Sequence, residues 1–262
     1  MKTGVEQMKS GHLLVIISFA LIFISIQAVQ PANASAQARI LPNYSDYLDT
    51  TSIPITYHVV GEIENTGTTN LHWLKVTANF YDENNSLLGS SSSYALLEVL
   101  LPGRKTPFEV VFKDSNVNQI QNYTLSLQFS EYADEKPPSL QILESTTYVD
   151  EAGFQKINGT IKNLALQNAT AVKVIATFYN EESKVSGVAY SYTIPSTIMP
   201  NQTAPFELEL KRKGLYFPDY NLTAESSEYA LVTELPSSQL PLLLPVSLLI
   251  TLFVHRKHKT NA

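Results

Sequence analysis

The sequence predicts an all-β protein in which two tandem β-sandwiches lie between an N-terminal signal peptide and a C-terminal transmembrane helix. Three observations lead to this fold class: an internal repeat, apolar residues that alternate with polar ones, and long apolar runs at both ends of the 262-residue chain. The expected boundaries are 1–36 for the signal peptide, 37–135 and 136–234 for the two sandwiches, 235–254 for the helix and 255–262 for a basic tail.

The N-terminal segment has the order of a secretory signal peptide. Lys2 and Lys9 precede an apolar run from Leu13 to Ile26, and small residues follow as far as Ala36. A basic, then apolar, then small-residue order is typical of a segment that is cleaved after export, with an uncleaved signal anchor as the alternative. Under both interpretations the middle of the chain crosses a membrane.

The C-terminal segment predicts a membrane anchor. Residues 235–254 contain no charged side chain, and a spanning helix needs roughly 20 apolar residues. The basic tail at 255–262 follows directly, and basic residues stay on the cytoplasmic side. We therefore expect a single-pass protein of the cell membrane with an extracellular ectodomain. A cleaved sorting signal is the alternative, although the chain has no Leu-Pro-x-Thr-Gly motif.

The ectodomain contains a duplication. At an offset of 98, residues 61–113 align with 159–211 without a gap, and 18 of the 53 positions are identical, Gly61/Gly159 and Phe108/Phe206 among them. Two units of about 90 residues follow, and each is large enough to bury a core of its own.

Within each unit the apolar residues have a period of two, which is typical of half-buried strands. The clearest runs are 74–80, 108–112 and 123–129 in the first copy, with matching runs at 172–178 and 206–210 in the second. Turn residues such as Pro102-Gly103 separate the runs. Many short strands between turns predict a sandwich, and residues 134–138, with two prolines, predict a short, stiff linker.

The sequence resembles a known family. The elements that carry the resemblance are Gly61-x-Ile63-x-Asn65-x-Gly67, the strand end Phe80-Tyr81-Asp82, and Pro102-Gly103 followed by Pro107-Phe108. Together they resemble the FxLYD domain, an immunoglobulin-like β-sandwich of prokaryotic surface proteins, over most of residues 53–230. The motif itself falls on 78–82 and 176–180, where both copies lack the leading Phe and carry Phe in place of Leu. The resemblance implies no catalytic residues.

Charge and composition exclude several function classes. Residues 37–254 retain 13 basic and 23 acidic side chains, a formal charge of −10. Nucleic acid and anionic lipid both require a basic surface, so neither is an expected partner of the ectodomain. The chain has no cysteine, which excludes thiol catalysis and Cys-ligated zinc and favours a bacterial or archaeal source.

No motif for catalysis, cofactor or metal binding is present. His58 and His72 are the only histidines of the ectodomain, and they lack metal-ligand spacing. There is no Gly-x-Ser-x-Gly elbow and no Gly-rich phosphate loop. The acidic turn at 82–85 could offer oxygens to Ca²⁺, but a solvated turn is the simpler interpretation.

Sequons for N-glycosylation are more frequent than the composition predicts by chance. There are eight, of which Asn33 leaves with the signal peptide and Asn158 lies inside a predicted strand. The predicted acceptors are Asn43, Asn84, Asn122, Asn168, Asn201 and Asn221.

These observations predict a non-catalytic cell-surface protein with a structural or protein-interaction role in the cell envelope, whose partner is an envelope protein or a glycan. The alternative is a polysaccharide- or small-ligand-binding module, which an aromatic platform formed by Trp73, or by Tyr190 and Tyr192, would favour. A hydrolase would need a cleft lined by convergent carboxylates. For Trp73 we expect burial at the rim of the core more often than an exposed contact.

Overall fold

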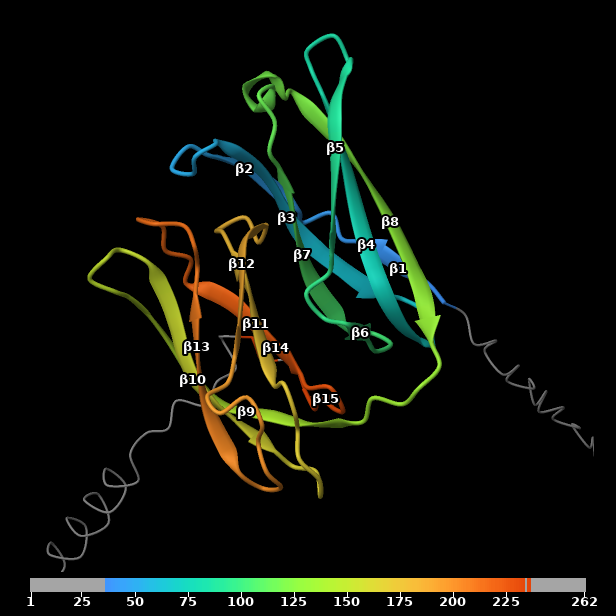
Figure 1. Ribbon diagram of the computed structural model, residues 1–262, viewed down its shortest axis with the longest axis vertical. Coiled ribbons are helices and arrows are strands. Elements are labelled where there is room, and N and C mark those ends of the chain that lie inside the picture. Colours follow the sequence, from blue (N-terminus) through green and yellow to red (C-terminus); the bar gives the residue numbers. More distant parts are fainter. Residues whose placement is uncertain (1–35, 234, 237–262) are drawn as a thin grey trace, which may run out of the picture. The chain divides into compact units, whose positions relative to one another are not determined.

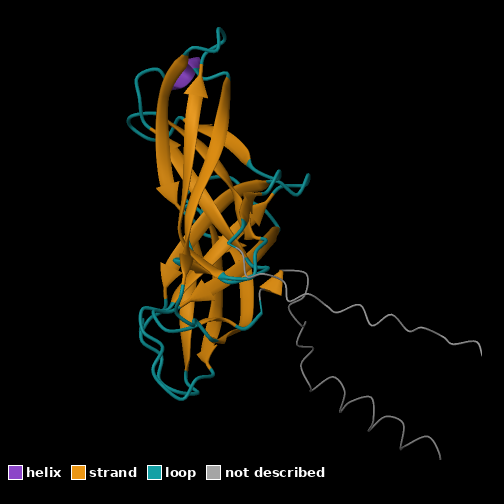
Figure 2. Cartoon of the chain, turned by 90° about the vertical axis from the view of Figure 1, so that its right-hand side faces the viewer, coloured by secondary structure: helices purple, strands orange, loops and turns teal. Residues whose placement is uncertain are grey.

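The computed structural model describes residues 36–233 and 235–236. The predicted signal peptide apart from its last residue, and the predicted membrane helix apart from its first two residues, lie outside them. The regular structure of the described residues consists of strands and one short 3-10 helix, η1 (Val117–Gln119) (Figure 2). None of it is a helix of the length and apolarity that crossing a membrane requires. The all-β prediction is confirmed for this part of the chain.

The first sandwich has two four-stranded sheets (Figure 1). In one, β3 is central: β7 pairs along one edge, and β1 and β2 pair along the other. In the second, β4 is central: β8 pairs along one edge, and β5 and β6 along the other. The strands are β1 (Ala38–Ile40), β2 (Ser45–Asp49), β3 (Thr56–Asn65), β4 (Asn70–Tyr81), β5 (Leu87–Tyr94), β6 (Val99–Leu100), β7 (Lys105–Phe112) and β8 (Asn122–Tyr132).

The predicted alternation decides which side chains form the first core. Leu74, Val76, Ala78 and Phe80 of β4 are fully or almost fully buried, and the residues between them are only half-buried. They meet the buried face of β7, which includes Phe108. Successive side chains of a strand point to opposite faces, so one face of each sheet supplies the core.

The second sandwich repeats this arrangement and has a separate core. Its strand order is β12-β11-β14-β15-β9-β10-β13, with β16 paired to β14. The short β15 pairs antiparallel with β14 and parallel with β9, and so joins the two layers into one eight-stranded sheet. The strands are β9 (Pro138–Val149), β10 (Gln155–Asn163), β11 (Lys173–Tyr179), β12 (Val185–Tyr192), β13 (Thr203–Glu209), β14 (Asp219–Glu225), β15 (Ala230–Leu231) and β16 (Leu235–Pro236).

Several identities between the copies preserve backbone geometry. The buried amide of Asn65 donates to the carbonyls of Thr69 and Leu100 at 2.8 and 2.9 Å. Asn163 makes the same two bonds, at the same lengths, to the carbonyls of Gln167 and Ile198, which are the counterparts of Thr69 and Leu100. Because an unpaired buried carbonyl is costly, each Asn fixes the turn after its strand and explains why the position is unchanged in both copies.

The paired glycines leave room for aromatic rings. A Cβ built on Gly61 would lie 2.7 Å from the ring of Phe108, and one on Gly159 would lie 2.4 Å from the ring of Phe206. No real Cβ contact is this short, so glycine is required at both positions. Close approach of a ring to the backbone thus accounts for a glycine inside each of these two strands.

The two sandwiches contact one another directly. Ile175 of β11 is fully buried and belongs to the core cluster of the first sandwich. The backbone N–H of Val185 donates to the carbonyl of Asn43 at 2.8 Å, and the Tyr179 hydroxyl donates to Glu62 at 2.7 Å. A side chain of the second sandwich thus packs into the core of the first, and hydrogen bonds join the two beside it.

Candidate functional site: an aromatic pocket beside a buried ion cluster

Trp73 lies in β4 at a β-bulge, where the pairing of β4 with β8 shifts register between His72 and Lys75. Its φ of 54° is in the left-handed region, which a bulky residue rarely adopts. The bulge turns the indole outward, and Trp73 is 63% exposed. The expectation of a rim-buried Trp73 was wrong. The matching residue Ala171 has the same backbone, with a φ of 50°, so the position does not need a large apolar side chain for the core. The alignment of Trp73 with a small Ala171 in the second copy was the sequence signal that Trp73 is not a core residue.

Four aromatic rings lie in a row at this point. Trp73 meets Tyr94 edge-on, with ring centroids 5.8 Å apart and an angle of 66°. On its other side, Trp73 lies 5.7 Å from His72, which lies 5.3 Å from Tyr132. The rings line a cavity of about 490 Å³, which we call the aromatic pocket. Its other walls include Leu97, Glu98, Lys136 and Ser227.

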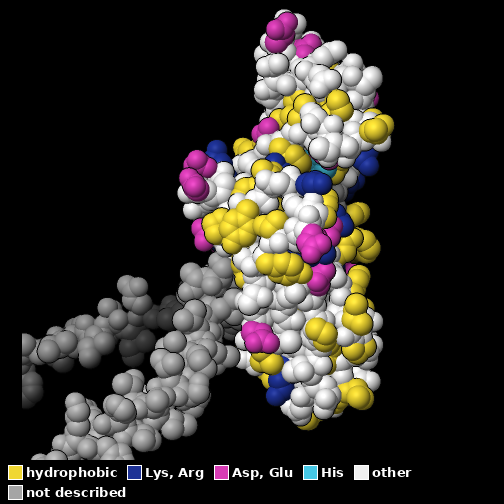
Figure 3. Space-filling view, turned by 90° about the vertical axis from the view of Figure 1, so that its left-hand side faces the viewer, with side chains coloured by type: hydrophobic (Ala, Val, Ile, Leu, Met, Phe, Trp, Pro, Cys, Tyr) yellow, Lys and Arg dark blue, Asp and Glu magenta, His cyan; other side chains and the backbone are white. Residues whose placement is uncertain are grey.

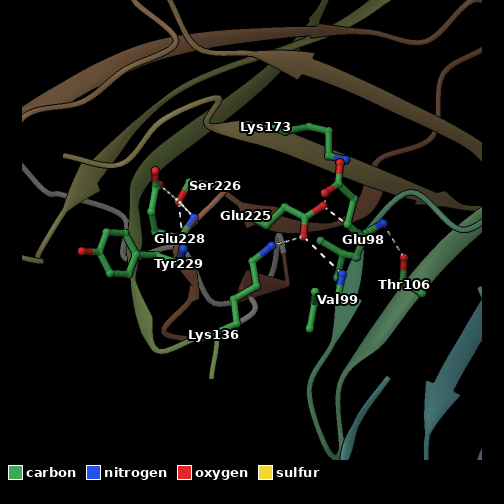
Figure 4. Close-up of polar contacts among 10 residues, drawn as sticks. Glu98, Val99, Thr106, Lys136, Lys173, Glu225, Ser226, Glu228 and Tyr229 are labelled. Atoms are coloured by element: carbon green, nitrogen blue, oxygen red, sulfur yellow. Dashed lines mark hydrogen bonds and ion pairs between the residues drawn. The ribbon is translucent and has the colours of Figure 1, made fainter. Parts of the chain in front are cut away.

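The polar wall of the pocket adjoins a buried ion cluster (Figure 4). Glu225, at the end of β14, is 3% exposed and accepts from two ammonium groups, Lys136 at 2.8 Å and Lys173 at 3.0 Å. The same carboxylate also accepts from the backbone N–H groups of Glu98 at 2.8 Å and Val99 at 3.5 Å. We call these groups the Glu225 cluster. It connects the linker, both sandwiches and the pocket wall.

Among the described residues, the second copy has no equivalent arrangement. Ala171 stands in place of Trp73, and the neighbouring Thr170 donates its backbone N–H and its hydroxyl to Glu228. Burial opposes ionisation of Glu228, but these bonds and one from Ser226 outweigh it and lower the pKa of the carboxyl. Tyr190 and Tyr192 are exposed on β12. The two tyrosines are two residues apart in this strand and therefore point to the same face of the sheet.

The other ectodomain histidine sits where the two sandwiches meet. His58 contacts Glu109 through Nδ1 at 2.8 Å and the Thr56 hydroxyl through Nε2 at 2.7 Å. A hydroxyl, an imidazole and a carboxylate in this order are the groups of a nucleophilic triad. Thr56 is only 4% exposed, however, so the hydroxyl is shielded from a substrate. We interpret these bonds as structural.

Arg212 joins this junction from the second sandwich. Its guanidinium lies 3.7 Å from the ring centroid of Tyr47, which stacks on His58. Burial, followed by the negative charge of Glu109, raises the pKa of the Tyr47 hydroxyl well above its usual value. Burial lowers the pKa of Arg212. The contact is a cation–π interaction across the two sandwiches.

Metal ligands do not converge within residues 36–233 and 235–236: no group of three or more His, Asp or Glu side chains is placed to hold an ion. The acidic turn after β4 has a different role. The Asp82 carboxylate accepts from the backbone N–H groups of Asn84 and Ser86, both at 2.8 Å. This bonding closes the hairpin between β4 and β5.

The predicted glycan acceptors fall into two groups. Asn84, Asn122, Asn168 and Asn201 are exposed. Asn43 is half-buried and donates its amide to Glu62 at 2.8 Å. Asn221 is half-buried in β14, and its side-chain oxygen, like that of Asn43, is buried without a hydrogen-bond partner. A bulky glycan fits the first group.

The surface carries no continuous basic field on the face drawn in Figure 3. Acidic and basic side chains are interspersed there, and apolar side chains form several separate patches. That nucleic acid is not a partner stays a prediction.

Comparison with known proteins gives distant structural similarity only. No family model matches the chain. No curated protein matches it by sequence. Among solved structures, a β-glucuronidase from Bacteroides uniformis aligns over 77% of this chain and 32% of its own, with a TM-score of 0.30 and 11% identity. The exo-chitosanase CsxA from Amycolatopsis orientalis aligns over 73% and 26%, with a TM-score of 0.26 and 11% identity. Red sea bream transglutaminase aligns over 75% and 31%, with a TM-score of 0.25 and 9% identity. The chain thus spans about a third or less of these proteins, at TM-scores too low to support an inference about activity. The resemblance to the FxLYD domain stays a prediction.

Proposed function

We propose that this protein is a non-catalytic, membrane-anchored surface protein whose ectodomain binds a saccharide in the aromatic pocket. The observation that carries the proposal is the outward-facing Trp73 at a left-handed bulge, with Tyr94, His72 and Tyr132 beside it. A left-handed backbone conformation costs free energy in a residue other than glycine, and residues in sparsely populated backbone regions cluster at ligand sites.

The pocket suits a ring that has both apolar and polar parts. Ligand sites typically enclose roughly 300–1,000 Å³, with mostly apolar walls and a few polar groups, and the aromatic pocket of about 490 Å³ fits this description. A pyranose presents C–H groups on its faces and hydroxyls at its edge. Trp73 and Tyr94 offer aromatic rings to the C–H groups of the sugar. Lys136 and Ser227 offer polar groups to its hydroxyls.

The pocket does not have the groups that cleave a glycoside. Such hydrolysis normally uses two carboxylates on either side of the scissile bond. Among the residues that line the aromatic pocket, Glu98 is the only acidic one. We therefore propose binding without turnover.

A structural role is the second candidate, because the two sandwiches are joined by several buried contacts. The Glu225 cluster and Ile175 hold the linker and both cores together. An envelope protein that transmits or resists force would benefit from such a connection. The two roles are compatible, since a ligand site on an anchored, rigid ectodomain serves attachment.

Calorimetry of the full-length protein in detergent, titrated with a panel of oligosaccharides, tests the proposal. We expect Trp73→Ala to weaken binding of the recognised saccharide about tenfold or more, since buried aromatic contacts dominate interface energies. Tyr192→Ala is the matched control, because it removes the exposed tyrosine that corresponds to Tyr94 in the copy without a tryptophan. Unchanged affinity in Trp73→Ala would refute the proposed site.

A further inference from the structure

The Glu225 cluster has an unequal number of charges. Two lysines, Lys136 and Lys173, share the single carboxylate of Glu225. All three side chains are buried or nearly so: the exposed fraction is 4% for Lys136, 11% for Lys173 and 4% for Glu225. The cluster therefore carries one uncompensated positive charge, in a place where unpaired charge is unfavourable.

The carboxylate of Glu225 has no acceptor site left for a further hydrogen bond. It already accepts from two ammonium groups and two backbone N–H groups, which uses about four acceptor sites. An ammonium has three donors, and Glu225 is the one acceptor that the described chain gives to Lys136. Lys136 thus retains unused donors while it is only 5% exposed.

Lys136 also lines the aromatic pocket. The side chain that borders this aromatic-walled cavity thus ends in a buried, under-satisfied ammonium. Glu98, the acidic residue of the lining, is exposed, and within residues 36–233 no ion pair joins it to Lys136 or Lys173. Its charge is screened by water, whereas that of Lys136 is screened much less.

We infer that the aromatic pocket selects a saccharide that carries a carboxylate, a uronic acid unit, and that Lys136 is the residue that determines this specificity. The sugar ring lies against Trp73 while its carboxylate pairs with the Lys136 ammonium and balances the cluster. This inference rests on the proposed function and adds the chemical class of the ligand. A charge-assisted bond in a partly desolvated site discriminates against a neutral analogue, which would leave the ammonium unpaired.

The test compares two oligosaccharides of equal length and linkage, one of glucuronic acid and one of glucose, on the full-length protein in detergent. We expect at least tenfold tighter binding of the uronate, and this advantage should shrink as the NaCl concentration is raised. In Lys136→Met the uronate should bind no better than the glucose oligosaccharide. This variant leaves Glu225 and Lys173 as a balanced pair, so it should fold, which a thermal melt checks.

Two further variants keep the result interpretable. Lys184→Met removes the same charge from an exposed turn and should retain the preference for the uronate. Lys136→Arg keeps the charge and should also retain the preference. Lys136→Gln, which removes the charge but keeps hydrogen-bond donors, replaces Lys136→Met if that variant fails to fold, and it should lose the preference. If the native protein bound the two sugars equally and Trp73→Ala bound neither, the inference would be overturned and the proposed function would stand. A uronate preference that survives Lys136→Met would overturn the role of Lys136. Binding of neither sugar class, nor of any saccharide in the wider panel, would overturn both.

Discussion

The carboxylate of Glu225 accepts a 2.8 Å hydrogen bond from the backbone N–H of Glu98, 127 residues earlier in the chain. A strand end of the second sandwich thereby holds a loop of the first, and the loop is also a wall of the aromatic pocket. One side chain consequently contributes to stability, to the connection between the sandwiches and to the shape of the site.

Glu225→Ala should therefore be strongly destabilising. It would leave Lys136 and Lys173 buried without their anion, and breaking a buried pair in this way costs about 3–5 kcal/mol. Urea unfolding measures the loss. Glu131→Ala is the control: Glu131 is exposed, and the change should stay within about 0.5 kcal/mol. Similar losses in the two variants would show that the Glu225 cluster contributes little.

Gly159→Ala should destabilise the second sandwich. The new Cβ would lie 2.4 Å from the carbonyl oxygen of Glu144 as well as from the ring of Phe206, and the backbone atom cannot move aside. Overpacking of this kind costs about 1–3 kcal/mol. Gly103→Asn is the matched change that should be tolerated, because Gly103 has a φ of 71° in open space and the second copy carries Asn201 there with a φ of 59°. Thermal unfolding of both variants tests this: the midpoint should fall in Gly159→Ala and stay nearly unchanged in Gly103→Asn.

Asp49 should contribute stability that disappears in acid. Hydrogen bonds from Ser52, then from Thr51, lower the pKa of its carboxyl from 3.8 to about 2. Because the folded pKa is the lower one, the contribution is complete above the unfolded value of 3.8 and is lost as the pH falls through about 2. The difference in unfolding free energy between the native protein and Asp49→Ala should thus be constant near neutral pH and shrink below about pH 4. A difference that persists undiminished at pH 2 would contradict this linkage.

Among the six predicted acceptors, glycan occupancy should follow exposure. In a host that glycosylates sequons, we expect modification at Asn84, Asn122, Asn168 and Asn201, because these side chains reach solvent. Asn43 and Asn221 should stay unmodified in the folded protein, since both are half-buried and the Asn43 amide nitrogen, which would carry the glycan, donates to Glu62. Mass spectrometry of glycopeptides gives the occupancy at each position. Full occupancy at Asn43 would mean that modification precedes folding there.

Membrane topology can be tested separately from binding. A chain that ends after Glu234 should be released into the medium, whereas the complete chain should fractionate with membranes. Protease added to intact cells should digest the ectodomain and spare a tag placed after Ala262. Digestion of the tag would reverse the proposed orientation, and its loss during maturation would indicate a cleaved sorting signal.

Local patterns were sufficient to predict the fold class and the main core strands. The alternation at 74–80 and 108–112 matches β4 and β7, because burial on one face of a strand leaves a period of two in the sequence. β5 was not predicted: its run of four serines lies at a sheet edge and has no apolar alternation. The short β1 and β2 were missed for a related reason, since they have few residues in which a pattern can appear.

The candidate site was much less predictable than the fold. Lys136 lies in a linker rich in charge and proline, so the sequence favours a solvated side chain. Its burial depends on Glu225, which tertiary pairing brings near it from 89 residues away. The exposure of Trp73 depends on a left-handed bulge that no glycine marks. Both features arise from long-range geometry and not from propensity.

Trp73 and Ala171 share the same left-handed backbone conformation. The backbone turn is retained in both copies while its side chain differs, so the fold tolerates an exchange at this position without a new loop. Ala171→Trp would place a second indole on the same chain. A long polymer able to reach both would then be held by two attachments on one molecule, where the second is intramolecular and total affinity can rise about 10²–10⁴-fold. Because Thr170 stands where the first copy has His72, a second site as complete as the aromatic pocket would require further changes.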